Sequence, residues 1–166
     1  FFKYQPMKRI ALIFLLACSS CAFASTNVCF TPNGNCAQQI IDALAQAKKQ
    51  VLVQAYSFTS APIAKALADA KRRGVDVRVL LDKSQLKGKD SVLPYLSEQN
   101  IETKIDYKPA IAHNKVMVID DKTVVTGSYN FTASAEKRNA ENLLIIYDKE
   151  LANKYVLNFK IREAAS

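Results

Sequence analysis

The only histidine of the chain, His113, begins a segment whose residue types suit the cleavage of a phosphodiester bond. An unprotonated imidazole is a competent nucleophile near neutral pH, where its unperturbed pKa lies. Lys115 follows two residues later, so on a β-strand both side chains point to the same face. The ammonium group of Lys115 can therefore lie beside a phosphate that His113 attacks, and the pair predicts a nucleophile with a cation next to it.

A second polar pair, Ser128 and Asn130, has the same two-residue spacing and follows the next expected strand. Their hydroxyl and amide groups can donate hydrogen bonds to the phosphoryl oxygens. Gly127 precedes them and permits close approach of the backbone. Asp120 lies an odd number of residues from Lys115, so on a continuous strand it faces away from the expected phosphate site.

These residues form the pattern H-x-K-x4-D-x6-G-S-x-N, and the chain resembles the phospholipase D superfamily at every fixed position of it. Residues 55–59, 71–77 and 130–132 also resemble the small bacterial Nuc-type endonucleases of that superfamily. The resemblance implies a covalent phosphohistidine intermediate on His113 and a structural role for Asp120 in holding the turn that follows it. It also implies that Glu141 accepts a hydrogen bond from the nucleophile.

The single histidine has a consequence for assembly. A two-step displacement needs an attacking group and a separate acid for the leaving oxygen. The chain has one histidine and one copy of the motif, and the Nuc-type relatives pair two chains across a twofold axis. We therefore expect a homodimer with its active site at the twofold interface, in which one His113 attacks and the other donates the proton.

Several functions remain open at this stage. The leading one is an endonuclease that cuts DNA or RNA with little sequence preference. The alternatives are a phospholipid hydrolase or transferase with the same chemistry, and a non-catalytic nucleic-acid-binding dimer. Lys83, Lys87 and Lys89 can line a groove for a polyanion, and Tyr107 and Tyr129 are candidates for stacking on bases.

The residues give little support to a metal site, and we expect no cofactor. One histidine and two cysteines that suit a disulfide leave few soft ligands, and Asp120-Asp121 is the only clustered carboxylate pair. Cys29 and Cys36 flank a short loop of turn residues, which favours a structural disulfide over a redox-active pair spaced C-x-x-C.

The elements that must position these residues follow from hydrophobic periodicity. Early alternation of strands and helices, followed by a hairpin, predicts an α/β fold, an α/β/α sandwich on a mixed β-sheet. The expected strands cover 51–57, 75–81, 101–105, 115–119, 123–126 and 143–147. The expected helices cover 36–49, Ile63 to Ala70 with Gly74 beyond their end, 91–99, and a last helix from about 149.

Residues 1–24 read as a few upstream residues plus a secretory signal peptide, and 25–166 as one domain. Met7 is followed by Lys8-Arg9, an apolar run too short to span a bilayer, and Ala22-Phe23-Ala24, which suits cleavage. Removing three basic residues leaves +5 of the formal charge of +8, which suits an anionic partner. We expect a periplasmic or secreted protein without stable membrane association, lipidation of Cys18 being the alternative.

Overall fold

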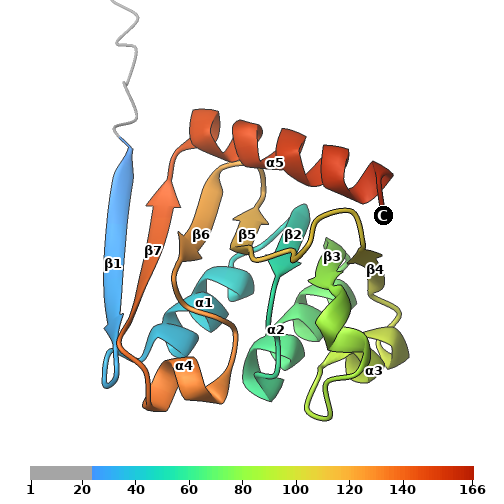
Figure 1. Ribbon diagram of the computed structural model, residues 1–166. Helices are drawn as coiled ribbons and strands as arrows, with labels where there is room; N and C mark the ends of the chain where they lie inside the picture. Colours follow the sequence, from blue (N-terminus) through green and yellow to red (C-terminus); the bar gives the residue numbers. More distant parts are fainter. Residues whose placement is uncertain (1–23) are drawn as a thin grey trace, which may run out of the picture.

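A seven-stranded mixed sheet organises the computed structural model, which describes residues 24–166 (Figure 1). The order of the strands across the sheet is β1-β7-β6-β5-β2-β3-β4. The strands are β1 (Ser25–Thr31), β2 (Gln50–Ala55), β3 (Asp76–Asp82), β4 (Glu102–Asp106), β5 (Lys115–Ile119), β6 (Thr123–Gly127) and β7 (Glu141–Tyr147). The expected signal peptide, apart from Ala24, and Cys18 lie outside the described residues.

The sheet is parallel on one side and antiparallel on the other. β2, β3 and β4 pair in parallel through helical crossovers, whereas β5 pairs antiparallel with β2 and forms a hairpin with β6. A parallel pair needs such a crossover, and a tight turn suffices for a hairpin. The expected mixed sheet is confirmed.

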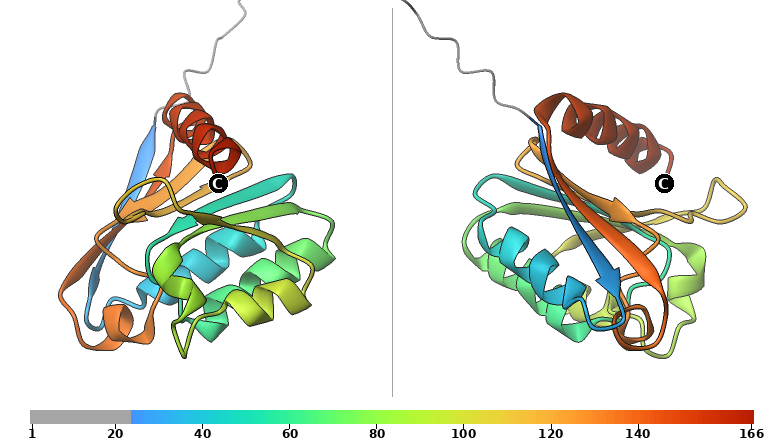
Figure 2. Two further views of the ribbon diagram at one scale, coloured as in Figure 1. Left: turned by 45° about the vertical axis from the view of Figure 1, so that its right-hand side comes forward. Right: turned by 90° about the vertical axis from the view of Figure 1, so that its left-hand side faces the viewer.

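Helices cover both faces of the sheet (Figure 2). On one face lie α1 (Cys36–Ala45), α2 (Ala61–Arg72) and α3 (Leu93–Glu98), and on the other lies α5 (Lys149–Ala164). The central strands are apolar on both sides because successive side chains alternate between the two layers. In β2, Val51 and Val53 join the core under α1 and α2, whereas Leu52 packs under Phe159 of α5. The expected α/β/α sandwich is thereby confirmed.

The structure adds elements that the sequence did not predict. β1 is an edge strand paired antiparallel with β7, and α4 (Ala133–Lys137) and the 3₁₀ turn η1 (Lys83–Leu86) are short. The expected disulfide between Cys29 and Cys36 is present, with the two Cα atoms 5.7 Å apart, and it ties β1 to the first residue of α1. Among residues 24–166, no helix combines the length and apolar character needed to cross a bilayer.

Candidate active site

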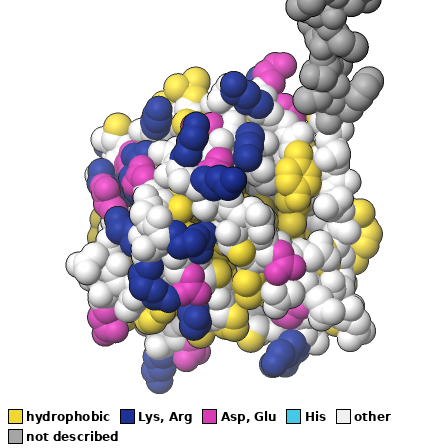
Figure 3. All heavy atoms as spheres, turned by 180° about the vertical axis from the view of Figure 1, so that it is seen from behind, with side chains coloured by type: hydrophobic (Ala, Val, Ile, Leu, Met, Phe, Trp, Pro, Cys, Tyr) yellow, Lys and Arg dark blue, Asp and Glu magenta, His cyan; other side chains and the backbone are white. Residues whose placement is uncertain are grey.

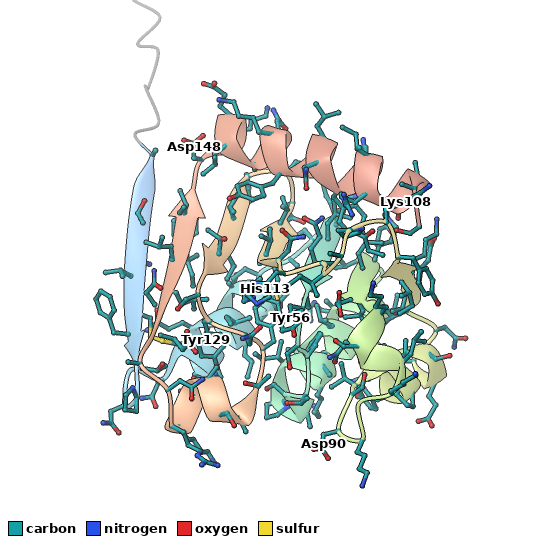
Figure 4. All side chains as sticks on the ribbon, in the orientation of Figure 1. Tyr56, Asp90, Lys108, His113, Tyr129 and Asp148 are labelled. Atoms are coloured by element: carbon teal, nitrogen blue, oxygen red, sulfur yellow. A yellow bond between two sulfur atoms is a disulfide. The ribbon has the colours of Figure 1, made fainter. Side chains whose placement is uncertain are left out.

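Three neighbouring strands end where the expected reactive residues lie. β2 ends at Ala55, which pairs with Lys115 at the start of β5, and the register of the β5–β6 hairpin brings Gly127 to the same edge. His113 lies just before β5 and Ser128 just after β6, so the sheet brings both to one place (Figure 4). Residues 15 positions apart in the chain thus meet because the hairpin folds back on itself.

His113 and Lys115 differ in their exposure to solvent. His113 is exposed, whereas Lys115 is only 8% exposed. The Lys115 ammonium group donates a hydrogen bond of 2.9 Å to the carbonyl oxygen of His113. Burial lowers the pKa of Lys115 below its usual value, against the opposing effect of the Glu141 carboxylate. A poorly hydrated cation is therefore bound to the backbone of the residue that carries the exposed imidazole.

Tyr56 is a site residue that the sequence analysis did not single out. Its ring lies 4.4 Å from the His113 ring, centroid to centroid, and 5.0 Å from the Lys115 nitrogen. Its backbone N–H donates a hydrogen bond of 2.8 Å to the carbonyl of Asn114. The signal in the sequence was its position directly after the buried strand β2, in the segment that resembles the Nuc-type relatives.

Ser128 and Glu141 form a short hydrogen bond. The Ser128 hydroxyl donates to Glu141 Oε2 at 2.5 Å and accepts from the backbone N–H of Asn142 at 3.1 Å. Asn139 Nδ2 donates to the other carboxylate oxygen at 2.9 Å. Among the described residues no hydrogen bond joins Glu141 to His113, the contact that the resemblance implied. The structure places Glu141 against Ser128 instead.

Asn130 and Gly127 complete the motif on this edge. Asn130 Oδ1 is a buried atom without a hydrogen-bond partner among residues 24–166. A buried polar atom is normally paired, so an orphan in a site marks a group available to a ligand. Gly127 has φ +145°, and a Cβ atom there would lie 2.2 Å from the carbonyl oxygen of Asn142. Position 127 therefore requires glycine because the backbone of β7 lies too close for a side chain.

Asp120 lies at the opposite end of β5 from Lys115. Its carboxylate accepts hydrogen bonds from the backbone N–H groups of Lys48, Lys49 and Gln50, at 2.7 to 3.1 Å. Burial acts to raise the pKa of Asp120, but these amides together with Lys122 bring it below its ordinary value. The carboxylate thus holds the turn between α1 and β2, whereas we expected it to hold the turn that follows it.

Two of the residues proposed for nucleic-acid contact differ in accessibility. Tyr129 is 1% exposed and its hydroxyl donates to Glu136 at 2.8 Å, so the expected stacking of Tyr129 on a base is wrong. Burial and the Glu136 charge raise the pKa of Tyr129 far above its ordinary value. Tyr107 is 58% exposed and can still meet a ligand. Residues 24–166 contain no group of three or more His, Cys, Asp or Glu side chains placed to hold a metal ion.

A pocket of about 290 Å³ opens beside His113. Its polar lining comes from Asn114, from Asn158 and Arg162 of α5, and from His113 itself. Pro109, Ile111 and Ala112 complete the wall. His113 thus lines a hollow together with two amide side chains and one guanidinium group.

Comparisons with known proteins agree with this geometry. A family model described as cardiolipin synthase, PLD-like domain, matches residues 40–162. A phospholipase D of Rickettsia conorii is 48% identical over 143 residues, which are 86% of this chain and 72% of the relative. The crystal structure of Nuc from Salmonella typhimurium, a phospholipase D family member, has a TM-score of 0.82 and 35% identity, and covers 86% of this chain and 96% of its own. NucT from Helicobacter pylori has a TM-score of 0.78 and 26% identity, over 86% of this chain and 98% of its own.

Proposed function

The chain belongs to the phospholipase D superfamily of phosphodiesterases, and we propose that it is an endonuclease that hydrolyses DNA or RNA through a phosphohistidine intermediate. The single observation that carries the proposal is the exposed His113, whose backbone carbonyl accepts a hydrogen bond from the buried ammonium group of Lys115. An imidazole open to the solvent can reach phosphorus, and a fixed cation stabilises the negative charge that gathers on the phosphoryl oxygens.

The reaction takes two displacements. A ring nitrogen of His113 attacks phosphorus, the bond from phosphorus to the leaving oxygen breaks, and His113 of the partner subunit gives that oxygen a proton. His113 of the partner subunit then takes a proton from a water molecule, whose oxygen attacks the phosphohistidine and releases the ring. Each histidine ends in the protonation state in which it began.

Lys115 and Asn130 supply the remaining charge and hydrogen bonds. The Lys115 ammonium is held at the backbone carbonyl of His113, and the Nδ2 group of Asn130 can donate a hydrogen bond to a phosphoryl oxygen. An ionised Glu141 can only accept, so the Ser128 hydroxyl donates to it and must turn toward the phosphate when substrate binds. Glu141 thus holds the Ser128 hydroxyl in place before substrate binds.

We propose a homodimer as the active form because one chain supplies one histidine. An isologous arrangement around a twofold axis brings the same residue of both subunits together, which is what attack and protonation at one phosphorus atom require. The exposure of His113 at the edge of the sheet leaves it accessible to a second copy.

Nucleic acid suits the surroundings of His113 better than a lipid does. The pocket beside it has the polar groups of Asn114, Asn158 and Arg162. Lys83, Lys87 and Lys89 follow β3, and Lys108 follows β4, and all four are exposed on segments that leave the carboxyl ends of strands parallel to β2. The face opposite to that of Figure 1 has both basic and acidic side chains (Figure 3). The exposed lysines after β3 and β4 are cations that the phosphates of a polyanion can contact.

A phospholipid substrate is the second candidate, because the matched relative is a phospholipase D and the family model is described as cardiolipin synthase. The structure has an apolar hollow that an acyl chain can enter, lined by Ala61, Pro62, Val92 and Tyr95 among others. That hollow lies between α2 and α3, and none of His113, Lys115 or Ser128 lines it.

The protein is proposed to act outside the cytoplasm, in the periplasm or after secretion. The disulfide between Cys29 and Cys36 supports this location, because such bonds persist in oxidising compartments.

The decisive experiment tests one preparation of the protein on both candidate substrates, DNA and phospholipid. Plasmid DNA and phosphatidylcholine vesicles are incubated with the protein in excess EDTA, beside the His113→Ala variant. Nicking of DNA that continues in EDTA and disappears in the variant supports the proposal. Turnover of lipid without nicking assigns the same site to phospholipids, and inactivity on both substrates leaves a non-catalytic nucleic-acid-binding protein.

A further inference from the structure

Two carboxylates are buried side by side at the ends of β3 and β4. Asp82 is 1% exposed and Asp106 is 2% exposed, and the two face each other in the register of the parallel pair. A buried charge is costly unless it is paired or hydrogen-bonded. Each of the two carboxylates therefore needs a compensating partner.

Asp106 is compensated by a cation. Arg162, near the end of α5, donates from Nε and from Nη2 to the two carboxylate oxygens, each at 2.8 Å. This two-point ion pair neutralises Asp106 and fastens α5 across the sheet. The ion pair with Arg162 is thus a sufficient structural explanation for the buried carboxylate of Asp106.

Asp82 is compensated differently. Within residues 24–166 it makes no ion pair, and its two oxygens accept backbone N–H groups. Oδ1 takes the N–H of Ser84 at 2.8 Å and begins the turn η1, whereas Oδ2 takes the N–H of Ala112 at 2.7 Å. The first bond is local. The second bond spans 30 residues and ends one residue before His113.

His113 is consequently held on both sides by backbone contacts. The N–H of Ala112 is bound to Asp82, and the carbonyl of Asn114 is bound to the N–H of Tyr56 at 2.8 Å. The exposed side chain between them has no such restraint of its own beyond the ring of Tyr56. Its direction is therefore set by the backbone of residues 112–114.

We propose that Asp82 is a positioning residue of the reaction, whose ionised carboxylate fixes the backbone at Ala112 and thereby the direction from which His113 meets phosphorus. The inference rests on the proposed role of His113 as the nucleophile. A hydrogen bond to a charged acceptor is stronger than a neutral one, and a displacement of the reacting atom by about 1 Å costs roughly 100-fold in rate. A carboxylate that touches no substrate can in this way control turnover.

The test distinguishes the hydrogen bond of Asp82 to Ser84 from its hydrogen bond to Ala112. Asp82→Ser keeps a short acceptor that can still begin η1 but cannot reach Ala112, and Asp82→Asn replaces one oxygen by an NH₂ group of the same size. With bis(p-nitrophenyl) phosphate as substrate, we expect both variants to lose about 10- to 100-fold in kcat. The KM should stay nearly constant, because Lys115 and Asn130 remain in place.

Asp148→Asn is the matched control. Asp148 also begins a helix with its carboxylate, which accepts from the N–H of Leu151 at 3.0 Å, and it lies at the start of α5, away from His113 (Figure 4). Thermal unfolding of all variants gives an assay temperature at which each is folded, and at that temperature the kcat of Asp148→Asn should stay at the wild-type value. Loss of kcat in the Asp82 variants alone then cannot be a general effect of lost stability.

A second measurement does not depend on turnover. The amide proton of Ala112 and the imidazole protons of His113 are followed by nuclear magnetic resonance, and their signals should move in both Asp82 variants but not in Asp148→Asn. The inference is overturned if these signals stay in place, or if the Asp82 variants match Asp148→Asn in kcat while His113→Ala is inactive. A wild-type protein that cleaves no phosphodiester would refute the proposed function instead, and the resonance signals alone would then decide whether Asp82 sets the position of His113.

Discussion

The ring of Tyr56 lies against the imidazole of His113, with the centroids 4.4 Å apart and the planes tilted by 54°. The same ring faces the Lys115 nitrogen at 5.0 Å. One aromatic side chain therefore borders both the nucleophile and the cation of the proposed reaction. It restricts the rotation of the imidazole and lies within cation–π distance of the Lys115 ammonium group.

Replacing Tyr56 by Ala should lower kcat by roughly 10-fold, because His113 then samples directions that do not lead to phosphorus. Tyr56→Phe should retain nearly full activity, since the hydroxyl makes no hydrogen bond within residues 24–166. Steady-state kinetics with a small phosphodiester measures both variants. Equal losses in the two variants would instead assign a function to the hydroxyl.

Lys115→Met should lower kcat/KM by about 100-fold or more, because it removes a preorganised cation from the phosphate site. The free energy of unfolding should stay constant or rise, because Met fills a buried position without the cost of desolvating a charge. Urea unfolding and kinetics on the same preparation compare the two effects. A large loss of stability would show that Lys115 serves mainly to hold the fold.

The activity should also fall on the alkaline side at a lower pH than an ordinary lysine would give. Burial lowers the pKa of Lys115, so as the pH rises this ammonium loses its proton before an exposed lysine does, and the phosphate loses its cation. Lys115→Arg should move this limb of the kcat/KM profile to higher pH, because a guanidinium keeps its proton. An unchanged limb in the arginine variant would assign it to another group.

Ser128 and Glu141 should behave as one unit. Their 2.5 Å hydrogen bond means that Ser128→Ala and Glu141→Gln remove overlapping contributions. We expect the double variant to lose little more kcat/KM than the more impaired single variant, with a coupling energy of about 1 kcal/mol or more. Additive losses would indicate that Glu141 reaches the substrate by a route that does not involve Ser128.

Asp120→Asn should affect stability and leave the chemistry intact. Losing the charged acceptor of three amides should lower the free energy of unfolding by about 2 kcal/mol at neutral pH, while kcat per folded molecule stays the same. The pKa of Asp120 is lowered in the folded state, so its contribution is fully present above the pKa of an unfolded aspartate. That contribution is lost as the pH falls through the folded pKa. The difference between wild type and variant in urea unfolding should therefore shrink in acid.

The sequence was sufficient to predict the central strands, at whose edge the candidate reactive residues lie. Period-two spacing and short apolar runs predicted β5 over the residues it occupies, and the pairing of β5 with β6 then follows from the tight turn at Asp120-Asp121. Helical spacing of apolar residues likewise predicted a last helix from about residue 149, and α5 begins there, with Phe159 buried against the sheet.

The features that were missed depend on contacts between distant parts of the chain. β1 is exposed over most of its length, and its strand conformation comes from pairing with β7, more than 100 residues away. Tyr129 lies in a polar motif and gives no local sign that its ring is buried under the contact with Glu136. In the sequence, Asp82 and Asp106 are ordinary carboxylates at strand ends. Their contacts with Ala112 and Arg162 form only in the folded chain.

β5 has Lys115 at one end and binds, through Asp120, the turn before β2 at the other. Only the first of these ends lies at the proposed active site, yet the five-residue interval between them is set by the pleat. One residue inserted into the strand would turn either the ammonium group or the carboxylate to the wrong side of the sheet. The interval between Lys115 and Asp120 is therefore a requirement of backbone pairing, and an enzyme engineer who wishes to alter the substrate must keep the length of β5.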